Sequence, residues 1–488
     1  MSLETIHVIP EPTKMELTGK YALLDNFHFE KVECGTGLVK QFGYFFGTCN
    51  GNGTLNILLD TTYSEEEYSI LIGEDQITIK ASSQNGFFYA LMTLQQLADG
   101  NKIPCGTVKD RPKLKMRGFH FKLGSMKQMG FKDVMRIIEM MGKFKLNTLL
   151  LEYTDKFPFK KHPALCASNA FTEEQVKEIE DFAAANYIDI IPLVQSLGHF
   201  EYVTEKPAYK HLAELEGNGQ LCPAKQETVE LIKDLLDEVM QTHPKSRYFH
   251  IGGDETRALG CCPECRKTAE NNGKSAVYLR HINKIIMEVK NKGRIPIIWD
   301  DMVSRHPEVI KELDHDAIIM YWDYWTTSSK SPILVARAAG YGIVHDKRWN
   351  NEWYAELQEP EKTIVAKFSQ GIDFTKDLGN DYLNIFGKYL GPDFPKHVTP
   401  FPNIHFFNDN GFTLIGAPTT LGNRIDDTFG LPNYNRFLGN IREFANACIN
   451  KNTLGLVTTA WYNFPPEILD LGILASAQFA WNGGTGQQ

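Results

Sequence analysis

The sequence predicts a (β/α)8 TIM barrel preceded by a small α+β domain, and three observations indicate this fold class. From residue 118 onward, eight strand-like apolar runs alternate with helical stretches, which is the element order of such a barrel. The runs are apolar on both faces, as in a parallel sheet that is covered on both sides. Before them, Asp110-Arg111-Pro112 marks the boundary between two different patterns of predicted strands and helices. We therefore expect an α+β domain over residues 1–110 and the barrel over 111–488.

In the first domain, short β-type runs alternate with turn signals. Residues 55–59 and 77–80 are predicted strands, and residues 86–97 have the apolar spacing of a helix. We interpret this small α+β module as a scaffold without a reactive site.

The barrel strands are expected at eight runs of the later sequence: 118–123, 148–153, 188–194, 248–251, 295–299, 318–322, 412–415 and 456–459. The gap between the sixth and seventh runs is too long for one helix. We therefore expect an insertion around 326–411, and long insertions in such barrels often form binding loops.

Composition excludes several classes of protein. Of the 488 residues, 42% are hydrophobic and 23% charged, as in an ordinary soluble globular protein. The net charge is −9 and basic runs are absent, so neither nucleic acid nor an anionic membrane is an expected partner. No stretch approaches the roughly 18 apolar residues of a membrane helix. The composition leaves the oligomeric state open.

The cysteines and the first residues of the sequence indicate the cellular compartment that we expect. The start, Met1-Ser2-Leu3-Glu4, lacks the features of a signal peptide, and nine cysteines form an odd count. Cys262 and Cys265 have the spacing of a zinc-binding pair, but no second well-spaced pair follows them. A reduced cytoplasmic protein without a bound metal or cofactor is therefore the expectation.

One stretch, His250-Ile251-Gly252-Gly253-Asp254-Glu255, combines a buried strand, a glycine turn and two adjacent acids. Adjacent carboxylates raise the pKa of at least one of them. A site that needs a proton donor at neutral pH requires this arrangement. A solvated loop with two surface acids is the alternative for Asp254-Glu255 alone, and the full stretch favours a reactive site.

Polar and aromatic residues follow the other predicted strands as well. In a barrel of this type the active site lies at the carboxyl ends of the strands. The residues found there are Glu152-Tyr153-Thr154-Asp155, Gln195-Ser196-Leu197-Gly198-His199, Trp299-Asp300-Asp301, Tyr321-Trp322-Asp323-Tyr324-Trp325 and Trp461-Tyr462-Asn463. Three tryptophans at one end of a barrel suit a sugar ring, which has an apolar face and polar edges.

The motif from His250 to Glu255 resembles the His-x-Gly-Gly-Asp-Glu signature of the glycoside hydrolase family 20 β-N-acetylhexosaminidases. The resemblance implies removal of terminal β-linked N-acetylhexosamine from a glycan, with retained configuration. Glu255 would protonate the glycosidic oxygen, and Asp254 would hold the 2-acetamido group that attacks the anomeric carbon. This substrate-assisted reaction needs no protein nucleophile.

The same resemblance implies roles for further residues. His199 would hydrogen-bond the catalytic acid and Asp155 would orient His199. Sugar contacts would come from Arg117, Trp299, Tyr321, Trp322, Trp461 and Asn463. The seventh strand, 414–420, lacks the Tyr-x-Asp pair that the family usually has, so a tyrosine from elsewhere, either Tyr321 or one in the insertion, is expected to take its place. Lys122 and Asn463 stand where the family often has acids, which leaves the choice between gluco and galacto configurations open.

The sequence leaves two alternative functions open. A metal-dependent barrel hydrolase would use His120, His199, His250, Asp254 and Glu255. A non-catalytic sugar-binding protein on the same scaffold is favoured only by the missing Tyr-x-Asp pair.

Overall fold

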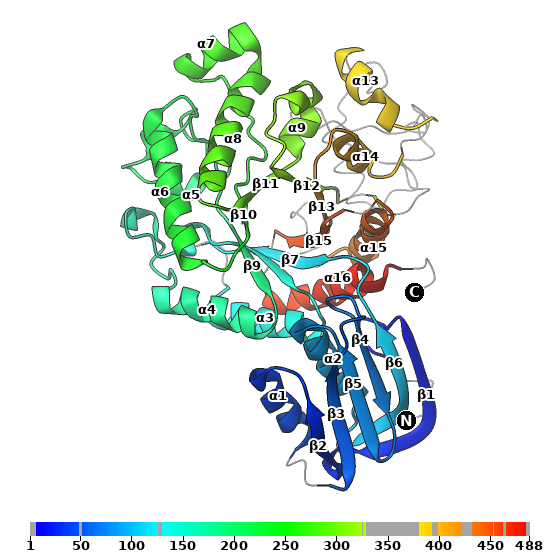
Figure 1. Ribbon diagram of the computed structural model, residues 1–488. Coiled ribbons are helices and arrows are strands. Elements are labelled where there is room, and N and C mark those ends of the chain that lie inside the picture. The colour runs from blue at the N-terminus through cyan, green and yellow to red at the C-terminus, as the bar shows by residue number, and fades with distance from the viewer. Residues whose placement is uncertain are drawn as a thin grey trace.

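The computed structural model describes residues 6–47, 51–124, 129–324, 326–327, 380–392, 399–421, 432–451, 453–461 and 465–484. A small sheet domain lies at the bottom of Figure 1 and a barrel lies above it. The fold class predicted from the sequence is confirmed.

The small domain is a mixed six-stranded sheet in the order β1-β6-β4-β5-β3-β2. Its strands are β1 (Lys14–Leu23), β2 (Phe27–Val32), β3 (Gly53–Leu59), β4 (Tyr68–Ile72), β5 (Gln76–Ala81) and β6 (Lys102–Asp110), and its helices are α1 (Thr36–Phe46) and α2 (Gln84–Leu97). The predicted strands 55–59 and 77–80 lie within β3 and β5, and the predicted helix 86–97 lies within α2. Ser83 starts α2 because its hydroxyl accepts a hydrogen bond from the Gly86 N–H.

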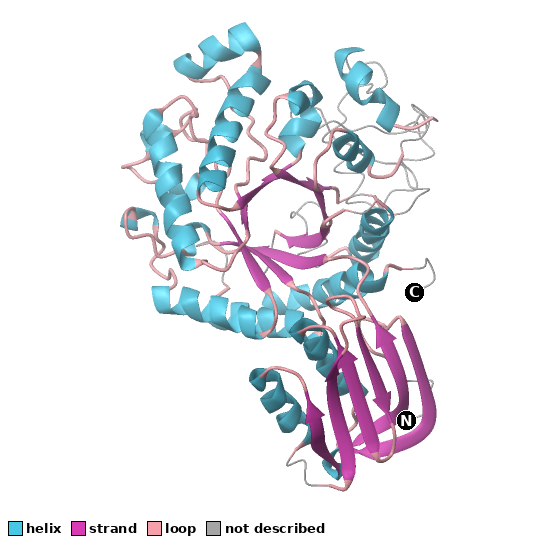
Figure 2. Cartoon of the chain, in the orientation of Figure 1, coloured by secondary structure: helices cyan, strands magenta, loops and turns pink. Residues whose placement is uncertain are grey.

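Eight parallel strands form the barrel: β7 (Met116–Lys122), β8 (Thr148–Glu152), β9 (Asp189–Leu193), β10 (Tyr248–His250), β11 (Ile295–Trp299), β12 (Ile318–Trp322), β13 (Leu414–Ala417) and β15 (Gly455–Ala460). Pairing of β15 with both β13 and β7 closes the ring, which Figure 2 shows with helices around it. A short strand, β14 (Thr419–Leu421), pairs with β15. All eight runs predicted from the sequence overlap these strands.

Helices cover the outside of the ring. They are α3 (Phe131–Lys143), α4 (Glu173–Ala185), α5 (Glu201–Thr204), α6 (Gln226–Thr242), α7 (Pro263–Asn272), α8 (Lys274–Asn291), α9 (Asp301–Arg305), α13 (Asn380–Phe386), α14 (Pro402–Asp409), α15 (Tyr434–Asn450) and α16 (Asp470–Asn482). Much of the predicted insertion 326–411 lies outside the described residues, and its described parts carry α13 and α14. Among the helices that the structure describes, none is both long and apolar enough to cross a membrane.

Side chains alternate between the lumen of the barrel and its outer face, as the two-residue period of a strand requires. On β7, Met116 packs in the cluster that fills the lumen, whereas Phe119 and Phe121 pack in the cluster beneath the helices. On β12, Met320 and Trp322 belong to the lumen, whereas Tyr321 belongs to the outer layer. Alternation therefore decides which side chains are available to a ligand.

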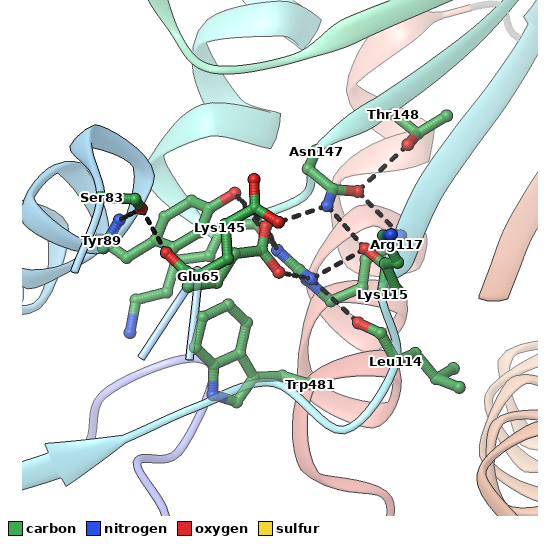
Figure 3. A network of polar contacts seen from close by, with 12 residues as sticks. Glu65, Ser83, Tyr89, Leu114, Lys115, Arg117, Lys145, Asn147, Thr148 and Trp481 are labelled. Atoms are coloured by element: carbon green, nitrogen blue, oxygen red, sulfur yellow. Dashed lines mark hydrogen bonds and ion pairs between the residues drawn. The ribbon is translucent and has the colours of Figure 1, made fainter. Parts of the chain in front are cut away.

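The two domains meet at a buried ion pair between Arg117 and Glu66. Nη1 and Nη2 of Arg117 lie 2.7 and 3.0 Å from the two carboxylate oxygens of Glu66. Nη2 also donates to the Tyr89 hydroxyl at 3.2 Å. Figure 3 shows this network, with Trp481 of α16 beside it. The guanidinium carbon lies 4.8 Å from the Trp481 ring centre.

A second buried pair lies beside the first. Nζ of Lys145 is 3.2 Å from Oδ2 of Asp110, and both side chains are fully buried. The Trp481 indole donates to Oδ1 of the same carboxylate at 2.8 Å. The last helix thus joins the barrel to the small domain, and Trp481 is its residue that reaches this ion pair.

The prediction that Arg117 grips sugar hydroxyls is wrong. Its side chain has no exposed surface and points to the outer layer. It also stands at the start of β7, whereas the site of such a barrel forms at the opposite strand ends. Arg117 instead ties the barrel to the small domain.

Candidate active site

The turn after β10 places two acids at the carboxyl end of the barrel. Gly252 and Gly253 have φ angles of 63° and 87°, a region that favours glycine. A Cβ on Gly252 would lie 1.8 Å from Oε1 of Gln195, so no side chain fits there. The Gly252 N–H donates to Nδ1 of His250 at 3.0 Å. The two glycines therefore let the chain turn against the loop after β9 and present Asp254 and Glu255.

Asp254 is held ionised by His199. Nε2 of His199 lies 3.1 Å from Oδ2 of Asp254. Burial opposes the charged form of Asp254, but the His199 cation and its hydrogen bond bring the pKa of Asp254 below its ordinary value. In return, burial disfavours the imidazolium, but the charge of Asp254 raises the pKa of His199 to about 9. At neutral pH this pair is an imidazolium and a carboxylate.

The pKa of Glu255 is shifted in the opposite direction. Burial and the charge of Asp254 raise the pKa of Glu255, against smaller effects of Arg257 and His199. Nη2 of Arg257 lies 3.0 Å from one oxygen of Glu255, and Nε2 of His199 lies 3.5 Å from the other. The Glu255 N–H donates to Oδ2 of Asp301 at 2.9 Å, which anchors a backbone at φ 48°. The two neighbouring carboxyls thus have opposed tendencies, one toward the anion and one toward the acid, which is the arrangement of an acid paired with a stabilising base.

Aromatic rings line the lumen beside these acids. The ring centres of Trp299 and Trp461 are 5.8 Å apart, and that of His250 lies 4.5 Å from Trp299. Burial lowers the pKa of His250 to about 3, so the ring is neutral. Its Nδ1 accepts from Gly252, which places the proton on Nε2. Nε2 has no hydrogen-bond partner among the described residues and is a donor available in the lumen.

Trp322 and Tyr324 extend this wall. Their rings stack with centres 5.1 Å apart and planes 29° apart. The indole N–H of Trp461 donates to the Tyr324 hydroxyl at 2.8 Å. Burial first, and the charges of Asp254 and Glu255 among the lesser causes, raise the pKa of Tyr324, so its hydroxyl stays neutral within reach of their fields.

A second ionic group of the lumen was missed by the sequence predictions. Lys122 and Glu152 are register partners on β7 and β8, with Nζ 3.0 Å from Oε1. Burial opposes the charge on Glu152, but Lys122 brings the pKa of that carboxyl below its usual range. Both stand at the last position of their strands, and that shared position was the available signal.

Two other predicted residues are not brought together with the acids, and a third lies where the structure gives no description. Tyr321 faces the outer layer, where it packs on Phe444 with ring centres 5.3 Å apart, so its predicted sugar contact is wrong. Nε2 of His199 lies near the carboxylates of Asp254 and Glu255, and the Thr154 hydroxyl donates to the Asp155 carboxylate at 3.2 Å. The structure therefore does not place Asp155 behind His199. Asn463 lies outside the described residues.

The residues considered for a metal-dependent hydrolase do not form a ligand set. Among the described residues, the one group of three or more metal-ligating side chains with donor atoms within 4.8 Å of one another lies elsewhere, at Glu214, Cys222, Cys262 and Cys265. His199 is instead paired with carboxylates, and Nδ1 of His250 is occupied by a backbone N–H.

Comparison with curated proteins gives partial matches. Hexosaminidase D of Bos taurus is 36% identical over 168 residues, which are 33% of this chain and 49% of that protein. A beta-hexosaminidase of Porphyromonas gingivalis is 26% identical over 293 residues, which are 49% of this chain and 36% of that protein. The matches thus span half or less of the length of these relatives.

Solved structures agree in fold. The beta-N-acetylhexosaminidase of Bacteroides fragilis superposes with a TM-score of 0.67 at 19% identity, covering 99% of this chain and 92% of that one. A Streptomyces plicatus N-acetyl-beta-hexosaminidase gives a TM-score of 0.64 at 17% identity, with 99% and 91% covered.

Family models cover both domains. Residues 38–111 match glycosyl hydrolase family 20, domain 2, and residues 116–369 match the family 20 catalytic domain. The second match alone takes in more than half of the 488 residues. With the family's Asp-Glu pair at the carboxyl end of its fourth barrel strand, this chain belongs to glycosyl hydrolase family 20.

Proposed function

We propose that this chain is an exo-β-N-acetylhexosaminidase that removes terminal β-linked N-acetylglucosamine or N-acetylgalactosamine from glycans with retention of configuration. The observation that carries the proposal is the opposed pKa shifts of Asp254 and Glu255, beside a tryptophan-lined lumen. The hexosaminidase names of the relatives favour the same activity.

The reaction follows from the charges. The carbonyl oxygen of the 2-acetamido group attacks the anomeric carbon while the bond to the glycosidic oxygen breaks. Glu255 donates its proton to that oxygen, and Asp254 stabilises the positive charge that develops on the acetamido nitrogen. Water then opens the oxazolinium ring at the anomeric carbon, and the Glu255 carboxylate takes the proton from water. His199 acts on this chemistry through Asp254, by keeping that carboxylate ionised.

Tyr324 is the tyrosine we assign to the acetamido group, because it faces the lumen and Tyr321 does not. Tyr324→Phe is expected to lower kcat/KM for aryl N-acetyl-β-hexosaminides by about tenfold, the value of one lost hydrogen bond. Tyr321→Phe is the matched control and is expected to leave kcat/KM unchanged. Equal losses in the two variants would contradict the assignment.

The pH dependence of kcat/KM tests the role of His199. Activity needs Asp254 ionised and Glu255 protonated, and the His199 cation lowers the pKa of both. His199→Gln removes that cation, so both limbs of the pH profile are expected to move to higher pH. The acid limb should move by about 1–3 units, the usual effect of an adjacent opposite charge.

Arg257→Gln is the control for this profile. Arg257 contacts Glu255 and lowers the pKa of that carboxyl, so its loss should move the alkaline limb to higher pH and leave the acid limb in place. A His199→Gln profile that coincides with that of the parent would contradict the role given to His199.

The activity itself is tested with chromogenic substrates. We expect hydrolysis of at least one of the two epimeric aryl N-acetyl-β-hexosaminides, and inhibition by an acetamido-thiazoline, which mimics the oxazolinium ring. Binding of N-acetylhexosamine without turnover of either epimer would instead identify a sugar-binding protein. The ratio of the two rates gives the configuration preference that the sequence left open.

A further inference from the structure

Three cysteines and a glutamate converge beside the active-site loops. The donor atoms of Glu214, Cys222, Cys262 and Cys265 all lie within 4.8 Å of one another. Sγ of Cys222 is 3.4 Å from that of Cys262 and 3.7 Å from that of Cys265. Two thiolates on a tetrahedral zinc ion, each bonded at about 2.3 Å, would be about 3.8 Å apart. A disulfide would require about 2.05 Å.

The surroundings fit a bound cation. Cys222, Cys265 and Glu214 are buried. One carboxylate oxygen of Glu214 accepts the N–H groups of Cys261 and Cys262 at 2.9 and 3.1 Å. The other, Oε2, is buried and has no hydrogen-bond partner among the described residues, although burial of an unpartnered carboxylate oxygen is costly. The N–H of Cys265 donates to Sγ of Cys262 at 3.3 Å, which fixes the position of that sulfur in the cluster.

We propose that Cys222, Cys262, Cys265 and Glu214 bind one structural zinc ion. Three soft thiolates and one carboxylate suit a four-coordinate zinc, and four protein ligands close the site to substrate. The sequence predicted no metal site because no second well-spaced pair follows Cys262 and Cys265. The third cysteine of the proposed site, Cys222, instead lies 40 residues before Cys262.

The position of this site suggests its effect. Cys222 follows the loop that carries His199, and Cys262 and Cys265 begin α7 just after Glu255. These two loops already share a hydrogen bond from the Ala258 N–H to Gln220 at 2.8 Å. A zinc ion would link them a second time and fix the spacing between His199 and the two acids. This consequence for catalysis rests on the proposed function, whereas the metal site does not.

Metal content tests the proposal independently of hydrolysis. The purified full-length chain is expected to carry about one zinc ion, with three sulfur ligands near 2.3 Å and one oxygen near 2.0–2.2 Å by X-ray absorption. Cys265→Ser is expected to lose most of this zinc. Cys34→Ser, which alters a half-buried cysteine of the small domain, is the matched control and should keep it.

Replacement of the metal covers the case in which Cys265→Ser fails to fold. The unaltered chain, exchanged into cobalt, should gain the near-ultraviolet thiolate-to-metal absorption and the visible bands of a tetrahedral ion. Zinc retained equally in Cys265→Ser would overturn the proposal. Metal-free protein whose intact mass shows a disulfide would also overturn it. A cobalt-exchanged protein without the spectrum of a four-ligand site would do the same. Absence of turnover in protein that contains zinc would contradict the proposed function, whereas the proposed metal site would still hold.

Discussion

Replacing Glu255 with glutamine is expected to lower kcat on N-acetyl-β-hexosaminides by about 10²–10⁴-fold, the usual contribution of a general acid. Glutamine keeps the shape of the side chain and cannot give up a proton. The loss should be larger for a natural glycan than for a nitrophenyl glycoside, because an alcohol leaves poorly without protonation. Steady-state kinetics on both substrates measure the difference.

Glu178→Gln serves as the control, since Glu178 is exposed on α4 and its loss should leave kcat unchanged. A Glu255→Gln variant with an equal loss on both kinds of substrate would contradict proton donation by Glu255. Such a result would point to a role in binding or folding instead.

Loss of the interdomain ion pair is expected to give the largest effect on stability. Arg117→Met would leave the Glu66 carboxylate without its bidentate partner, and breaking a buried pair from one side typically costs about 3–5 kcal/mol. The free energy of unfolding, measured by denaturant titration of the full-length chain, should fall by that amount. The exposed pair Lys14–Glu16 is the control, and Lys14→Met should cost less than about 1 kcal/mol.

The same pair predicts a pH effect on stability. Burial opposes the charge on Glu66, but Arg117 lowers the pKa of Glu66 below its ordinary value. A depressed carboxyl pKa adds stability above the unfolded pKa, and this stability is lost as the pH falls through the folded pKa. The difference in unfolding free energy between the parent and Arg117→Met should therefore shrink in acid. A difference that does not depend on pH would contradict the ion pair as its cause.

The sequence predicted the fold because its signals were local. Each barrel strand is a short apolar run, and the glycines before Asp254 mark a turn that accepts no side chain. The residues at the carboxyl ends of these runs, such as Trp299 and Trp461, therefore pointed to the site.

Arg117 and Tyr321 were misplaced for a common physical reason. Both point away from the lumen, and strands that are apolar on both faces give no hydrophobic contrast from which the facing of a residue can be read. Arg117 nevertheless offered one usable signal, since it precedes its apolar run and so belongs to the amino end of the strand.

Contacts between distant segments could not be derived from the sequence. His199 pairs with Asp254 as well as with the acid Glu255, because the loop after β9 packs against the turn at Gly252 and Gly253. Cys222 reaches Cys262 and Cys265 only through the packing of two loops. Lys122 and Glu152 meet because β7 and β8 pair in a register that places their last residues side by side.

The central claim is that the substrate's own amide is the nucleophile, with Asp254 and Glu255 assisting. A series of aryl β-glycosides bearing N-acetyl, N-fluoroacetyl, N-difluoroacetyl and N-trifluoroacetyl groups tests it most directly, because fluorine withdraws electrons from the attacking carbonyl oxygen. We predict that kcat/KM falls stepwise along the series. A kcat/KM that stays constant across all four substrates would contradict participation of the amide and require a nucleophile from the protein.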